Sequence, residues 1–121
     1  MKYMLLIYGA ENAWTEAERN ACIADSVALC HELNSKQQYL GASPLHPVAS
    51  ATSIRNQNGH KVVTDGPFVE THEQLGGYFL IDVPDLDTAI KIAKRIPGGS
   101  KGTVEIRPVV ELSTLPTTPQ A

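Results

Sequence analysis

The sequence has no excess of positive charge and no long apolar run. Its 121 residues include 10 Lys and Arg against 13 Asp and Glu, which gives a net charge of −3. Proteins that bind phosphate backbones or anionic membranes need a positive surface, so we expect no nucleic acid and no membrane as partners. The apolar run Met4-Leu5-Leu6-Ile7 is far shorter than the roughly 20 residues of a bilayer span and too short for a signal-peptide core. A cytoplasmic location is therefore expected.

Cysteine is scarce and the histidines are scattered. Cys22 and Cys30 are eight positions apart on a predicted helix, about 12 Å along its axis at roughly 1.5 Å per residue, which is too far for a disulfide. No histidines share a paired spacing on a helix, and only His31 adjoins a cysteine, from which its side chain diverges. No glycine pair forms a phosphate-binding motif, and no serine or cysteine has a nucleophile's setting. We expect no metal, no cofactor and no covalent catalysis.

Apolar periodicity predicts an α+β protein. Strands are expected over residues 2–8, 39–43, 51–55, 60–64, 77–83 and 103–110. Thr15 and Glu18 form a capping box that starts a long first helix, and Asp85 caps a second helix. Asn58-Gly59 is a strong signal for a hairpin between the third and fourth strands.

Each helix has one apolar stripe that is expected to face the core. In the first helix the stripe is predicted to contain Cys22, Ile23, Ser26, Leu29, Cys30 and Leu33. In the second helix it is predicted to contain Leu86, Ala89, Ile90, Ala93 and Ile96.

The order of the elements predicts one domain over residues 1–112, with both helices on one face of an antiparallel sheet. The Thr/Pro-rich residues 113–121 are expected to form a flexible tail. The strands over 4–8 and 78–80 carry apolar residues toward the uncovered face. Because monomers rarely expose so large an apolar patch, we expect a second copy to cover it and form a homodimer.

The connection over residues 65–77 is longer than a hairpin loop and concentrates the ionisable residues. Gly66 before Pro67 is expected to turn the chain sharply. Thr71 and Gln74 fit a capping box, which predicts one helical turn over residues 72–75 that ends at Gly76. That turn would hold three ionisable side chains at one strand end, those of Glu70, His72 and Glu73.

Three carboxylates are the candidate catalytic residues. Asp65, at a strand terminus beside an apolar cavity, is the first candidate for a general acid or base. The alternative is that Asp65 only shapes its turn by bonding following backbone amides. Glu70 and Glu73 are the other two candidates, and their alternative is a solvated loop.

Four further residues are candidates for substrate binding. Tyr8 ends the first strand and is placed to bond a substrate oxygen or to satisfy its own hydroxyl. Phe68 is expected to be an apolar anchor, and His72 to act as a proton shuttle or to lie on the surface. Arg107, on the same strand face as Glu105, binds an anionic ligand or pairs with a glutamate across the sheet.

Several motifs together resemble the DGPF-type branch of the YCII-related proteins. They are Asp65-Gly66-Pro67-Phe68, Glu70-Thr71, Glu73-Gln74-Leu75-Gly76-Gly77, Val83-Pro84-Asp85-Leu86-Asp87, Ile96-Pro97 and Val104-Glu105-Ile106-Arg107-Pro108-Val109. The resemblance implies a ferredoxin-like domain that dimerises face to face as a dimeric α/β barrel. Relatives most often have lysine at the position of His72. The histidine that the wider group carries near the start of its first helix is absent from residues 20–24.

We therefore expect a small-molecule enzyme that performs isomerase- or lyase-like acid/base chemistry, without a metal, in a pocket of a homodimer. The alternative is a non-catalytic ligand-binding or regulatory dimer. Relatives of this branch are often linked with alternative sigma factors, which implies a role in transcription control for that alternative.

Overall fold

The computed structural model describes residues 1–116. Its helices and strands are β1 (Lys2–Gly9), α1 (Glu16–Ser35), β2 (Tyr39–Pro44), β3 (Thr52–Gln57), β4 (His60–Asp65), β5 (Gln74–Asp82), α2 (Leu86–Ala93) and β6 (Gly102–Pro108). Short 3₁₀ turns are η1 (Glu11–Ala13), η2 (Val48–Ser50) and η3 (Pro97–Lys101). Within these residues, no helix is both long enough and apolar enough to cross a membrane.

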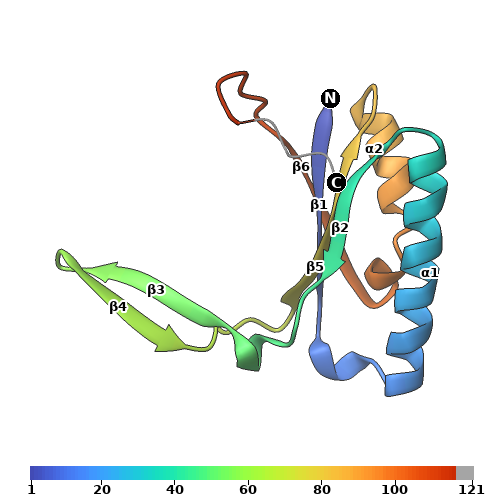
Figure 1. The fold of residues 1–121 in the computed structure, drawn as a ribbon. Coiled ribbons are helices and arrows are strands. Elements are labelled where there is room, and N and C mark those ends of the chain that lie inside the picture. Colours follow the sequence, from blue (N-terminus) through green and yellow to red (C-terminus); the bar gives the residue numbers. More distant parts are fainter. Residues whose placement is uncertain (117–121) are drawn as a thin grey trace.

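Four strands form the main sheet, in the order β2-β5-β1-β6, and every neighbouring pair is antiparallel. Both helices lie on one face of this sheet (Figure 1). The arrangement confirms the predicted α+β class and is consistent with a ferredoxin-like fold. Residues 113–116, at the start of the predicted tail, are exposed, and residues 117–121 lie outside the described part of the chain.

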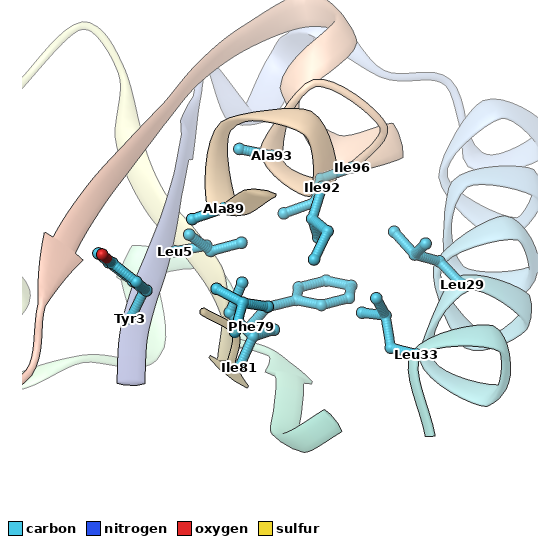
Figure 2. Packing of buried hydrophobic residues seen from close by; sticks show 11 residues of the cluster. Tyr3, Leu5, Leu29, Leu33, Phe79, Ile81, Ala89, Ile92, Ala93 and Ile96 are labelled. Atoms are coloured by element: carbon cyan, nitrogen blue, oxygen red, sulfur yellow. The ribbon is translucent and has the colours of Figure 1, made fainter. Parts of the chain in front are cut away.

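The core lies between this sheet and the two helices (Figure 2). The central strands contribute Leu5 and Ile81, which are fully buried, and Phe79, whose ring lies in the middle of the cluster. Opposite them, the helix side supplies Leu29, Leu33, Ala89, Ile92, Ala93 and Ile96. Burying one large apolar side chain contributes about 1.5–3 kcal/mol, so this cluster is the main source of stability.

The two helices bury fewer of the predicted residues than expected. In α1 only Leu29 and Leu33 are buried, whereas Ile23 is 43% exposed. The reason is geometric, because α2 has only eight residues and lies beside the C-terminal half of α1, so the N-terminal half has no neighbouring helix (Figure 1). In α2, Leu86 is exposed, whereas Ile92, which was not in the predicted stripe, is buried in the core.

The start of α1 is fixed by local hydrogen bonds, as predicted. Thr15 Oγ1 accepts a bond from the Glu18 backbone N–H at 3.1 Å, and Glu18 Oε1 accepts one from the Thr15 N–H at 2.9 Å. Lys101, at the end of η3, donates to Glu18 Oε2 at 2.6 Å and to the Ala13 carbonyl at 2.9 Å. Its ammonium also lies 4.9 Å from the centre of the Trp14 ring. These contacts join η3 to the helix start.

Strands β3 and β4 form a separate two-stranded hairpin. Asn58 and Gly59 have φ values of 49° and 81°, the left-handed pair that a tight hairpin turn requires, so the predicted turn is confirmed. The hairpin projects from the body on the side of the sheet opposite the helices (Figure 1).

The predicted helical turn over residues 72–75 is wrong, because β5 begins at Gln74 and Leu75 pairs with Tyr8 of β1. Thr71 and Gln74 both donate side-chain bonds to backbone carbonyls, whereas a capping box needs a side chain that accepts from an N–H. Pairing with β1 thus satisfies the backbone hydrogen-bonding groups that a helical turn would have used. Gly77 lies within this strand, opposite Ile7, and the position requires glycine because an added Cβ would lie 2.9 Å from the Ser43 carbonyl oxygen of β2.

The capping box makes a prediction about acid stability. The hydrogen bond from Lys101 and the Thr15 N–H lower the pKa of Glu18 from 4.5 to about 2. The anion therefore stabilises the fold fully above pH 4.5, and this contribution is lost as the pH falls toward 2. We expect Glu18→Gln to lower the free energy of unfolding at neutral pH, and the difference from wild type to shrink across this window in urea titrations.

The matched control is Glu16→Gln, which changes a carboxylate in the same helical turn but outside the capping box. Because Glu16→Gln leaves the bonds between Glu18, Thr15 and Lys101 in place, it should lower the free energy of unfolding at neutral pH by less than Glu18→Gln does. Equal behaviour of the two variants would contradict the capping role of Glu18.

Candidate functional site

The sheet face opposite the helices, here called the open face, carries both apolar and ionisable side chains. Residues paired directly across antiparallel strands share a face, so the register identifies its members. The apolar members are Met4, Leu6, Tyr78 and Leu80, and the polar members include Tyr8, Thr103, Glu105 and Arg107. The apolar members are only half-buried, whereas Leu5 on the other face of β1 is completely buried.

Tyr8 and Glu105 form a hydrogen bond on the open face. The Tyr8 hydroxyl donates to Glu105 Oε1 at 3.3 Å, which is longer than the usual 2.5–3.0 Å for two oxygens, so a ligand oxygen could compete for this donor. Partial burial, followed by the charge and hydrogen bond of Glu105, raises the pKa of Tyr8, and the Arg107 charge opposes this rise. The phenol therefore stays protonated at neutral pH and can act as a donor.

Glu73 reaches the same end of the open face. The Thr103 hydroxyl donates to Glu73 Oε1 at 2.9 Å, and Thr103 is the residue directly opposite Tyr8 in the β1–β6 register. The last acid of the 65–77 connection is thereby held near the Tyr8–Glu105 pair. We call Tyr8, Glu73, Thr103, Glu105 and Arg107 the open-face cluster.

A polar hollow of about 390 Å³ lies beside the start of β5. It is lined by Ala10, Glu11, Asn12, Thr71, His72 and Gln74. Glu11 is held in place because its carboxylate accepts a bond from the Val48 N–H at 2.9 Å, and its own N–H donates to Gln74 Oε1 at 3.2 Å. His72 and Gln74 line the hollow, while Glu73 between them bonds Thr103.

The other predicted site residues lie toward the hairpin. Asp65 ends β4 opposite Thr52 and is exposed, and Glu70 is exposed on the connection. Phe68 is 72% exposed, so within this chain it does not anchor the connection as expected, although its carbonyl accepts a bond from Arg55 at 2.8 Å. No group of three or more His, Cys, Asp or Glu within residues 1–116 is arranged to hold a metal ion.

The structure thus gathers three predicted residues, Tyr8, Glu73 and Arg107, on one face. It adds Thr103 and Glu105, which were not among the predicted site residues. The alternation of side chains along β6 indicates that Glu105 and Arg107 share a face. Only the register between β1 and β6 shows that this face is also the face of Tyr8. Catalysis by Asp65 or Glu70 stays a prediction.

Comparison with known proteins identifies the family of this chain. The sequence profile of the YCII-related domain matches residues 1–113. The chain belongs to the YCII-related domain family. This YCII-related chain is also similar to an uncharacterized protein of Rhizobium meliloti (strain 1021), with 35% identity over 120 residues that cover 90% of this chain and 92% of the relative. The family resemblance is confirmed, and assignment to the DGPF-type branch stays a prediction.

The open-face cluster makes a prediction about the titration of Tyr8. Because Glu105 raises and Arg107 lowers the pKa of Tyr8, Glu105→Gln should move its titration step to lower pH and Arg107→Gln to higher pH. The measurement is phenolate absorbance against pH, with Tyr8→Phe used to identify the Tyr8 step among the four tyrosines.

Glu111→Gln is the matched control, since Glu111 follows the same strand and pairs with Lys2 instead. In that variant, the titration step of Tyr8 should occur at the same pH as in the wild type. If Glu105→Gln also left it in place, the electrostatic link between the two strands would be refuted.

Proposed function

We propose that this YCII-related protein is a small-molecule enzyme that performs isomerase- or lyase-like proton transfer in a pocket between two copies packed open face to open face. The Tyr8–Glu105 hydrogen bond, with Arg107 on the same strand face, is the observation that carries this proposal. A hydrogen-bond donor, a base and a cation on one partly apolar surface are the components that such chemistry needs.

The uncovered apolar residues support the homodimer. Met4 and Leu6 lie next to Leu80 and Tyr78 across the strand pair, which forms a continuous apolar strip on the open face. Two sheet faces typically pack about 10 Å apart, a distance that would remove both strips from water. The polar cluster would then border a drier space, in which its charges interact more strongly.

Four members of the open-face cluster have a role in the proposed reaction. Glu105 is the base, and it removes a proton from a carbon next to a substrate carbonyl. The electron pair of the broken C–H bond moves to the carbonyl oxygen, where the Tyr8 hydroxyl stabilises the negative charge. In a substrate whose enolate is conjugated with a C=C bond, the electron pair moves back from oxygen through the dienolate, and return of the proton at the far carbon completes an isomerisation in which the double bond has moved. Glu73 is the second carboxylate at that end of the face. Arg107 binds a substrate carboxylate through its two-pronged guanidinium.

The homodimer is tested by Leu6→Glu, which places a charge in the middle of the apolar strip. We expect wild-type protein to sediment as a dimer at micromolar concentration and Leu6→Glu to sediment as a monomer. Leu86→Glu is the matched control, because this leucine is 49% exposed on α2, on the far side of the sheet. A monomeric wild type would contradict the proposed arrangement.

The chemistry is tested by deuterium exchange from solvent into a panel of 2-oxo and 3-oxo carboxylic acids, followed by NMR. We expect Glu105→Gln to slow exchange by roughly 10²- to 10⁴-fold, the usual contribution of a general base, with the dimer intact. Arg107→Gln should mainly raise KM, because it removes a binding contact. Asp65→Asn and Glu70→Gln are the comparison variants, and exchange that depends on them instead would place catalysis in the connection.

A different outcome would favour the alternative role. The alternative predicts that ligands of the same panel raise the melting temperature of the wild type while no exchange occurs with any of them. That result would contradict the enzyme and support a non-catalytic ligand-binding dimer, with sigma-factor-type regulation as the next test.

A further inference from the structure

The β3–β4 hairpin is well formed although little of the chain covers it. Its six cross-strand pairs run without interruption from Thr52–Asp65 to Gln57–His60. Every residue of β4 is exposed, and in β3 only Ser53 is partly covered. An isolated two-stranded hairpin is only marginally stable in water, so a further contact is expected to stabilise it.

The two faces of the hairpin differ. On one face, Ser53 donates to the Gly66 carbonyl at 2.8 Å and Arg55 to the Phe68 carbonyl at 2.8 Å, so the following segment lies against that side. On the other face, Ile54 and Val63 are directly paired and are 69% and 65% exposed. A bare pair of β-branched side chains at the centre of a strand pair is a contact surface without a partner.

The direction and length of the hairpin fit a second copy of this chain. The hairpin projects on the side of the open face (Figure 1). Six residues per strand extend about 20 Å, whereas facing sheets pack about 10 Å apart. A copy seated on the open face would therefore lie alongside the hairpin, and the outer half of the hairpin would reach past its sheet.

The charge distribution also favours a second copy. Residues 52–65 contain Arg55 and Lys61 and one acid, Asp65, so the hairpin carries +1. The remaining residues hold eight basic and twelve acidic side chains, which leaves them at −4. The hairpin is thus attracted to the body of another copy, and both basic residues lie in its outer half.

We propose that the β3–β4 hairpin is a clasp that packs its Ile54–Val63 face against the side of a second copy of this chain. The clasp rests on the homodimer of the proposed function and adds a second contact to the sheet-to-sheet one. In a twofold dimer each copy gives one clasp and receives one. The clasp also continues into the 66–73 connection, which carries His72 and Glu73, so its docking fixes the edge of the site.

The test is the double variant Ile54→Asp/Val63→Asp. We expect the dimer dissociation constant in sedimentation velocity to rise at least about tenfold, as for loss of a buried apolar anchor. Far-ultraviolet circular dichroism should still report the four-stranded sheet and both helices, because the hairpin contributes nothing to the core. Val62→Asp is the matched control on the opposite face of the hairpin, and it should leave the constant within about twofold.

The outcomes separate the clasp from the dimer itself. If Leu6→Glu dissociates the dimer and the hairpin variant does not, the clasp is overturned while the sheet-to-sheet dimer stands. An equal effect of Val62→Asp would overturn the assignment to the Ile54–Val63 face. A hairpin that binds a different protein, with an unchanged dimer, would also overturn the clasp, and a monomeric wild type would overturn both proposals.

Discussion

The pairing of β1 with both β5 and β6 is the constraint on which the rest of the structure depends. Leu5 is buried completely beneath the helices while its neighbours Leu6 and Tyr8 face the other way. Because side chains alternate along a strand, a slip of one residue would move the core residues to the open face and the cluster into the core. The free-energy cost of exposing Leu5 and Phe79 to water therefore holds the register that places Tyr8 on the open face.

The same register determines the chemistry of the open face. Tyr8 lies opposite Thr103 of β6, two residue pairs from Glu105, and its hydroxyl bonds the Glu105 carboxylate across 97 positions of sequence. The irregularity between Ile7 and Tyr8 sets Tyr8 opposite Leu75, just after the residues that line the hollow. Glu73 is thereby brought to Thr103 by the start of β5. The core supports this cluster without containing any of it, which leaves its groups accessible to a ligand.

Local features were predictable from residues close together in the chain. The capping box at Thr15, the cap at Asp85 and the hairpin turn at Asn58-Gly59 all depend on groups within four positions of one another. The Thr71–Gln74 pattern has the same spacing but forms no cap, because Gln74 and the residues after it pair with β1. A local pattern predicts structure only where no stronger long-range pairing competes for the same backbone groups.

The sequence by itself determined the strands, the two helices, the family and the existence of an acidic connection, because each of these is set by nearby side chains or by motifs. The tertiary structure alone decided which of these acids meet. It placed Asp65 at the end of the β3–β4 hairpin, and it joined Glu73 to a cluster from β1 and β6. The physical reason is that a site built across strands depends on register, and register is fixed by burial of the opposite face. No spacing within one segment of the chain encodes that choice.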